Sequence, residues 1–407
     1  MSTDNHLIAS AQKKEPSSDL YERQLPLYDY LMKKYIIRSF SSSSSGSLAT
    51  STVLSQSTAL DTSIYTIQLN ALKLLLSTFS NVGPSNELAY KQCNVKNGKL
   101  NYIEINKKSD GNDKKKTLVL CHGYASGLGF FFQNYDHFSQ DFDRVIAVDW
   151  NGMGMSAAHT NNIKRSPLLS FLYIVSSTLS PSSYISSKIR KHHYEANKKS
   201  IDFFTDSLEE FRKETLKDTT FVLAGHSLGA YLCGQYTAKY PSFVDSLILI
   251  SPVGIDSQPQ EKEKTLDIRR NFVQMLWHTN FTPQTILKGM LILRGSDFTY
   301  NFVKKTFSRR FGNRWENDQL ETITRYFYLL TINSSIGEYA LNSLLDPIVT
   351  KQQKQDGTIE NRVRLFAHTP LVETFAIIEK KLPILTLYGD TDWLAYADVM
   401  NDMKKLR

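Results

Sequence analysis

Short apolar runs, spaced widely along the chain, constrain its fold more than any other feature. They occupy residues 117–121, 144–150, 220–224 and 246–251, and a further run follows at 383–388. Each has the length of a strand that is buried on both faces, and the intervening segments are long enough for crossover helices. This alternation is typical of parallel strands. The sequence therefore predicts an α/β fold with a mostly parallel, doubly wound sheet.

The run at 220–224 leads directly into Gly225-His226-Ser227-Leu228-Gly229, and residues 230–239 then have the composition of a helix. A G-x-S-x-G pattern between a strand and a helix predicts a nucleophile elbow with the serine at the tip of a strained turn. The two glycines would let strand and helix approach closely, and the helix N-terminus would offer N–H groups to an oxyanion. The pattern arises by chance in roughly one chain in ten of this length, so its meaning depends on the other strand ends.

Polar segments follow the other runs, at the sheet edge where α/β proteins place their sites. Residues 122–131 form a glycine-rich turn whose N–H groups would complete an oxyanion hole; a flexible loop is the alternative. Residues 149–156 lack the spacing and the lysine of a phosphate loop, which favours a tight structural turn. The last run ends in two carboxylates, and we prefer Asp392 over Asp390 as the acid of a catalytic triad.

These patterns divide the chain into five parts. Residues 1–63 are polar and serine-rich, and we predict a disordered region with a targeting role as an open alternative. Residues 64–99 are a predicted helical lead-in. Residues 100–254 and 381–407 form the two parts of the catalytic core. Residues 255–380 are far too long for an ordinary connection, so we predict a helical cap inserted over the sheet edge.

Periodicity also predicts several local elements. Residues 65–79 have helical spacing, and packing on the domain is favoured over lying on a membrane. Residues 100–106 alternate as a half-buried strand, and residues 195–217 form a helix with one apolar face. Residues 356–364 are predicted to be a loop of the cap. The basic segment 188–193, which follows an apolar stretch, fits either docking on anionic lipid or a surface insertion.

Composition narrows the classes of partner. The net charge of +8 is compatible with an anionic partner. Because no nucleic-acid motif accompanies it, we favour either phospholipid or no special meaning of the charge over nucleic acid. Cys93, Cys121 and Cys233 are few and odd in number, which argues against a disulfide-built domain; Cys121 and Cys233 are predicted to be buried thiols. No apolar run reaches the roughly 18–20 residues that cross a bilayer. No metal or cofactor is expected.

Taken together, the motifs resemble the α/β-hydrolase family, and more narrowly its lipid-acting branch of abhydrolase-domain phospholipases, the fungal cardiolipin-specific deacylase and its paralogues. The resemblance covers residues 100–402 and rests on the segments 122–131, 149–156, 225–231 and 389–393. It implies Ser227 as the nucleophile and Asp392 as the triad acid, with the backbone N–H groups of Tyr124 and Leu228 as the oxyanion hole. The supporting motif residues are His122, Gly123, Gly225, His226 and Gly229.

The same resemblance implies a serine hydrolase that removes acyl chains from cardiolipin or a related phospholipid during acyl-chain remodelling. A mitochondrial location, peripheral to the inner membrane, is implied as well, and the basic, serine-rich residues 33–49 fit such targeting. Two alternatives remain open. One is a lysophospholipid acyltransferase that uses the same serine. The other is a non-catalytic lipid-binding co-activator on the same fold.

The histidine of the triad is the exception to the pattern. In this family it follows the acid after one more strand and helix, whereas the last histidine here is His368, which precedes the acid within the predicted cap. His122 is expected to be structural, and the ring of His226 is not expected to reach Ser227 productively. We therefore expect that the base lies beyond the given residues, together with a last strand and helix. The alternative is a fold that lacks its base. Loss of one triad member typically costs roughly 10⁴–10⁶ in rate.

Overall fold

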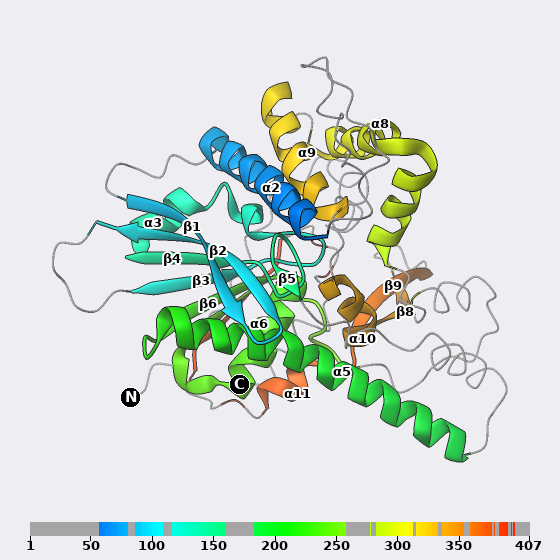
Figure 1. The fold of residues 1–407 in the computed structure, drawn as a ribbon. Coiled ribbons are helices and arrows are strands. Elements are labelled where there is room, and N and C mark those ends of the chain that lie inside the picture. Colours follow the sequence, from blue (N-terminus) through cyan, green and yellow to red (C-terminus); the bar gives the residue numbers. More distant parts are fainter. Residues whose placement is uncertain are drawn as a thin grey trace.

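The computed structural model describes residues 57–79, 86–108, 116–158, 183–257, 277, 282–311, 315–332, 336–353, 359–376, 378, 382–389, 392 and 394. A central sheet carries helices on both faces (Figure 1). Its strands are ordered β1-β2-β4-β3-β6-β7-β10, and the short β5 pairs with β2. The strands are β1 (Asn86–Val95), β2 (Gly98–Lys107), β3 (Thr117–Cys121), β4 (Arg144–Val148), β5 (Ala157–Ala158), β6 (Phe221–His226), β7 (Val244–Ile250) and β10 (Ile384–Leu387).

The five strands that the apolar runs predicted, β3, β4, β6, β7 and β10, all pair in parallel. They form the centre of the sheet and one of its sides, while β1 and β2 add an antiparallel pair at the other side. Every residue of β3 is buried, as expected for a strand covered on both faces. The predicted doubly wound α/β class is therefore confirmed.

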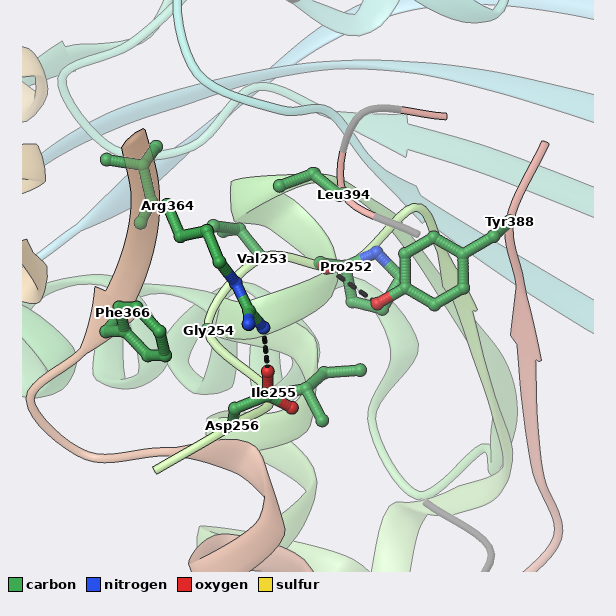
Figure 2. Close-up of a pocket in the computed structure, with 10 residues that line it drawn as sticks. Pro252, Val253, Gly254, Ile255, Asp256, Arg364, Phe366, Tyr388 and Leu394 are labelled. Atoms are coloured by element: carbon green, nitrogen blue, oxygen red, sulfur yellow. Dashed lines mark hydrogen bonds and ion pairs between the residues drawn. The ribbon is translucent and has the colours of Figure 1, made fainter. Parts of the chain in front are cut away.

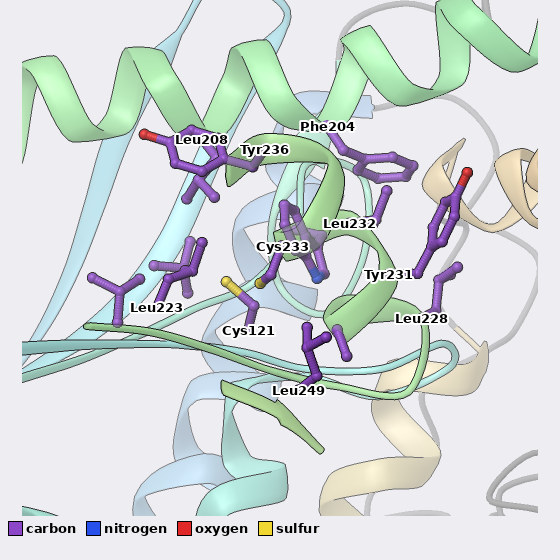
Figure 3. Close-up of a cluster of buried hydrophobic side chains, with 14 of the residues drawn as sticks. Cys121, Phe204, Leu208, Leu223, Leu228, Tyr231, Leu232, Cys233, Tyr236 and Leu249 are labelled. Atoms are coloured by element: carbon purple, nitrogen blue, oxygen red, sulfur yellow. The ribbon is translucent and has the colours of Figure 1, made fainter. Parts of the chain in front are cut away.

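Two hydrophobic clusters fill the space between the sheet and its helical layers. One face carries α5 (Ser183–Phe211), the π-helical turn η4 (Arg212–Leu216), α6 (Leu228–Lys239) and α11 (Leu371–Phe375). The other carries η3 (Leu128–Phe131), α2 (Ser57–Phe79), α3 (Tyr135–Asp141), α8 (Pro283–Phe311) and α9 (Asn317–Ile332). Figure 3 shows the first cluster, in which Cys121 of β3 and Cys233 of α6 face each other. Both thiols are free and buried, as predicted.

The lead-in contains a helix and a strand. Helix α2 packs on α9, with Leu72 and Leu75 fully buried and Gln68 Nε2 donating to the carbonyl of Leu329 at 3.0 Å. Packing on the domain, the favoured interpretation, is therefore confirmed. The purely helical lead-in is wrong, because residues 86–95 form β1. This strand is largely polar and only partly buried, so it lacked an apolar run; its pairing with β2 makes it a strand.

Strand β2 is also more buried than its alternation predicted, since Asn101 and Glu104 lie inside with their apolar neighbours. Glu104 tolerates burial because Lys91 and Arg144 both pair with it, the latter at 2.6 Å. Opposite charges hold the pKa of the Glu104 carboxyl below its usual range although burial acts the other way. The predicted strand is therefore confirmed, but its predicted half-burial is wrong, because polar residues usually indicate solvent.

The segment between β7 and β10 holds α8, α9, the short helices η6 (Ile336–Ala340) and α10 (Leu341–Leu344), and a hairpin of β8 (Leu345–Gln353) and β9 (Ile359–Ala367). A short helix η5 (Pro241–Phe243) precedes β7. The hairpin corrects the prediction of a loop at 356–364, because residues 359–364 belong to β9 and pair antiparallel with β8. Residues 356–358 lie outside the described part. The strand was missed because its sequence is polar and only its partner makes it regular.

Several further predictions fall on residues that the structure does not describe. These are the serine-rich N-terminal region up to residue 56, the apolar stretch within 159–182, and Asp390. Within the described helices, none combines the length and the apolar character that crossing a bilayer requires.

Candidate active site

Ser227 lies at the sharp turn between β6 and α6. Its backbone has φ 55° and ψ −117°, a strained conformation for a residue with a side chain. The turn is held on both sides: the Ser227 N–H donates to the Ile250 carbonyl at 2.9 Å, and the Ser227 carbonyl accepts from Tyr231 at 3.2 Å. The strand, turn and helix that the motif predicted are therefore present, with the serine at the tip.

The two glycines of the motif allow three backbones to meet at this turn. A Cβ on Gly225 would lie 2.6 Å from the carbonyl oxygen of Gly229. A Cβ on Gly229 would lie 2.2 Å from the carbonyl oxygen of His122. Strand β6, helix α6 and the segment after β3 thus approach more closely than any side chain permits.

The glycine-rich segment after β3 lies against the elbow. A Cβ on Gly123 would be 3.1 Å from the Cβ of Ser227, so the backbone that leads into Tyr124 runs beside the predicted nucleophile. Leu228 begins the first turn of α6, where N–H groups have no partner within the helix. Tyr124 also bonds through its hydroxyl to Gln284 of α8. This arrangement fits the predicted oxyanion donors, Tyr124 N–H and Leu228 N–H.

His122 joins the two glycine-rich turns. Its Nδ1 lies 2.7 Å from the Gly123 carbonyl, and its Nε2 lies 3.1 Å from the N–H of Trp150. We assign the proton to Nδ1, which donates, and the lone pair to Nε2, which accepts. Burial lowers the pKa of His122 to about 4, so the ring is neutral. With both nitrogens engaged, His122 holds the loop and is not free to act as a general base.

His226 directly precedes Ser227 and is equally unsuited to act as a base there. The ring stacks on Phe130, with 4.4 Å between ring centroids. Burial, the larger cause, and the neighbouring His122 lower the pKa of His226 to about 4. A base with so low a pKa holds little affinity for a proton near neutral pH.

We expect the His226 pKa to make stability depend on pH. The neutral ring is favoured in the folded state, so between pH 6.5 and 4 the unfolded chain binds more protons and the free energy of unfolding falls as pH falls. His226→Gln removes this titration. The free energy of unfolding of the wild type, relative to that of the variant, should therefore fall by up to about 3 kcal/mol as the pH falls through that window. Urea unfolding of both proteins from pH 4 to 7.5 measures it. A difference independent of pH would contradict the assignment.

Asp149 organises the site in a way that the sequence did not reveal. The buried carboxylate accepts from Leu128 N–H at 2.6 Å, from Met155 N–H at 2.8 Å and from the Asn101 amide at 3.2 Å. Burial raises its pKa to about 7, although the three donors act in the opposite direction. One side chain thus fixes both turns, 122–131 and 149–156. Its position directly after an apolar strand was the available signal.

The segment between β7 and β10, the predicted cap, also contacts the glycine-rich turn 122–131. Tyr326 of α9 is fully buried, and its hydroxyl accepts from the N–H of Gly129 at 2.9 Å. A Cβ on Gly129 would be 2.5 Å from the Tyr326 ring, so this glycine is needed for the contact. No sequence signal links residues 197 positions apart.

Asp392 follows β10 at the same sheet edge as the elbow, with β7 between β10 and β6. Its Oδ1 accepts from Leu394 N–H at 2.9 Å. A pocket lies beside it, lined by residues 252–256, 364–366, 388 and 394 (Figure 2). The pocket residue Leu394 is thus hydrogen-bonded to Asp392. Another pocket residue, Val253, lies close to the elbow, with its N–H 3.5 Å from the Ser227 carbonyl.

The walls of this pocket are partly polar. Arg364 pairs with Asp256 and lies over the Phe366 ring, and the Tyr388 hydroxyl donates to the Pro252 carbonyl at 3.0 Å. Desolvation, together with the nearby carboxylates of Asp392 and Asp256, raises the pKa of Tyr388. This hydroxyl therefore stays protonated as a donor.

His368 lies in the segment between β9 and α11. Its side-chain Nε2 is 3.5 Å from Asp346 Oδ2, and its backbone N–H donates to the Leu344 carbonyl at 3.0 Å. The His368 ring thus lies next to the carboxylate of Asp346, within the segment between β7 and β10. In the described part of the chain, no group of three or more histidine, cysteine or acidic side chains is placed to hold a metal ion.

Comparison with known proteins extends these findings. The family model described as "alpha/beta hydrolase fold" matches residues 116–407. A probable 1-acylglycerol-3-phosphate O-acyltransferase of Oryza sativa subsp. japonica is 26% identical over 308 residues, which cover 73% of this chain and 61% of the rice protein. A (lyso)-N-acylphosphatidylethanolamine lipase of Mus musculus is 25% identical over 283 residues, covering 68% and 65%.

A 1-acylglycerol-3-phosphate O-acyltransferase of Saccharomyces cerevisiae is 24% identical over 297 residues, covering 68% of this chain and 69% of the yeast protein. The chain spans about three fifths of the length of the plant relatives it matches. The names of these relatives describe enzymes of lipid acyl chemistry. The family match covers well over half of the chain and agrees with the strand order and the elbow. The chain belongs to the α/β-hydrolase fold family, in a branch whose members act on lipids.

Proposed function

We propose that the protein is a serine acyl hydrolase that removes a fatty acyl chain from a phospholipid, cardiolipin or a related lipid, during acyl-chain remodelling. The observation that carries this proposal is the strained elbow: Ser227 at φ 55° between β6 and α6, with the backbone of Gly123 packed against it. Strain of this kind persists only where the surroundings enforce it, and it is concentrated at functional sites.

The geometry supports a two-step reaction. Ser227 Oγ would attack the acyl carbonyl carbon and lose its proton to a base, while the carbonyl oxygen becomes an oxyanion that accepts from the N–H groups of Leu228 and Tyr124. The base would then protonate the departing lysophospholipid oxygen, leaving an acyl ester on Ser227. Water would hydrolyse this ester by the same steps. Asp392 would orient the base. His122 is not that base, because both of its ring nitrogens are engaged. His226 is a poor base, because burial, the larger cause, lowers its pKa to about 4.

A second candidate is acyl transfer to a lysophospholipid. It is favoured by the names of the relatives, of which the rice and yeast proteins are 1-acylglycerol-3-phosphate O-acyltransferases. The two reactions share the acyl-serine and differ only in whether water or a lysophospholipid hydroxyl receives the acyl group. The net charge of +8 supports an anionic phospholipid in either case, and a peripheral, mitochondrial location belongs to the same proposal.

Product analysis tests both candidates. We would incubate the protein with vesicles containing acyl-labelled cardiolipin, and separately with 1-acylglycerol-3-phosphate and a long-chain acyl-CoA, and quantify products by mass spectrometry. Release of fatty acid and lysocardiolipin supports the hydrolase, whereas formation of phosphatidic acid supports the transferase. If neither product forms and an active-site fluorophosphonate fails to label Ser227, the proposal is overturned in favour of a non-catalytic lipid-binding role.

A further inference from the structure

Helix α8 of the cap carries an unusual concentration of exposed apolar side chains. Eight large apolar side chains are exposed in the described part of the chain, and five of them lie on α8: Ile286, Ile292, Leu293, Phe298 and Phe302, which we call the α8 apolar surface. Ile292 and Leu293 are 83% and 81% exposed. Exposed apolar side chains that gather on one element indicate a binding site, whereas single scattered ones need no explanation.

The backbone of α8 presents this surface outward. Gly295 interrupts the helix with φ 78° and ψ 175°, two residues after Leu293. A Cβ added at Gly289 or Gly295 would meet no atom within 4 Å, so this side of the helix faces open space. The spacing of Ile286 to Leu293 and of Phe298 to Phe302 places each pair on one side of its own half of the helix.

The charges on α8 complement an anionic surface. Between residues 284 and 309 the helix carries five lysine or arginine side chains and one aspartate. Lys288 and Lys304 pair with Glu338 and Glu321. Arg294 and Lys305 are exposed beside the apolar side chains, and Arg294 lies over the Phe298 ring. Apolar side chains bordered by exposed cations are the pattern of a helix that lies in a membrane interface.

We propose that the α8 apolar surface docks the protein on an anionic phospholipid bilayer. This rests on the proposed function, because a phospholipid hydrolase must reach a substrate held in a membrane. A second copy of the chain is a poorer occupant, since a symmetric contact through this surface would bring two cationic helices together. In Figure 1, α8 lies at the outside of the molecule, away from the layer formed by α5 and α6.

The same helix also reaches the candidate active site. Near its start, Gln284 bonds to the hydroxyl of Tyr124, whose N–H is a proposed oxyanion donor. One turn later, Lys288 holds the buried Glu338 at 3.2 Å. Docking through α8 would therefore set the bilayer beside the loop that borders Ser227.

Vesicle binding tests the proposal independently of turnover. We would measure cosedimentation with vesicles of phosphatidylcholine containing cardiolipin, using Ile292→Ser/Leu293→Ser and the matched control Leu74→Ser/Val363→Ser, which removes two exposed apolar side chains elsewhere. The α8 variant should lose affinity by about tenfold or more, and the control should bind like wild type. Arg294→Gln/Lys305→Gln should weaken binding to the anionic vesicles severalfold and leave binding to pure phosphatidylcholine unchanged.

Equal binding by wild type and the α8 variant would overturn the docking surface, even if acyl release were observed. A wild-type dimer that the α8 variant dissolves, with vesicle binding unaffected, would likewise overturn it in favour of self-association. If vesicles bind through α8 while no acyl chain is released, the docking surface stands and the proposed function fails. Circular dichroism of both double variants shows whether they keep the fold.

Discussion

Replacing Ser227 with alanine should reduce acyl release by at least about 10⁴-fold, because the proposed acyl ester then has no oxygen on which to form. The remaining rate would come from the oxyanion donors and substrate binding. We expect the strained φ of 55° to stay in the variant, since the turn is held by backbone hydrogen bonds and the Ser227 side chain makes no capping hydrogen bond to α6. Fatty-acid release from labelled vesicles and fluorophosphonate labelling measure the effect.

Ser251→Ala is a matched control. Ser251 follows β7 at the same sheet edge and also has a positive φ, 48°, so the substitution makes the same chemical change in a similar backbone. We expect activity within a fewfold of wild type and unchanged thermal unfolding. A Ser227→Ala protein that keeps its full activity would rule out the acyl-serine, and equal losses in both variants would point to damage to the sheet edge instead.

Gly229→Ala should prevent stable folding, although it adds one methyl group. That methyl would lie 2.2 Å from the carbonyl oxygen of His122 and 2.7 Å from that of Cys121, and both atoms belong to the backbone at the end of the central strand β3. Neither can move without separating α6 from the sheet. We expect a loss of more than about 4 kcal/mol in the free energy of unfolding, measured by urea denaturation, or an insoluble product.

Gly289→Ala provides the comparison. Its Cβ would meet nothing within 4 Å, and alanine favours a helix over glycine, so stability should be unchanged or rise by up to about 1 kcal/mol. A Gly229→Ala protein as stable as wild type would mean that the elbow and the His122 loop are farther apart than the structure places them.

Apolar strands made the fold predictable. Segments such as β3 are buried on both faces, so their sequences are continuously apolar and their class follows directly. Strands β1 and β9 escaped prediction because they are polar, and each is defined by pairing with a partner strand. The same holds for Glu104, a buried acid that only Lys91 and Arg144 make tolerable.

In the candidate site, too, features set by local sequence were predictable and features set by tertiary contacts were not. The elbow was recognisable because strand, glycines and helix are adjacent in sequence, and strain at Ser227 is a local property of that turn. Tyr326, Gln284 and Asp149 were not recognisable, since each acts on a loop through a contact made by tertiary packing. A carboxylate after a strand is common, and nothing local shows that Asp149 bonds to two turns.

The three cysteines lie at different depths, and this has a practical consequence. Cys93 is in the antiparallel strand β1 at the edge of the sheet, while Cys121 and Cys233 are enclosed beneath the elbow. All three are buried, so a thiol reagent can modify the native protein only through an opening. Opening of the edge strand β1 exposes the Cys93 thiol, whereas exposure of Cys121 and Cys233 requires separation of α6 from the sheet. The order of alkylation therefore reports which part of the molecule opens first.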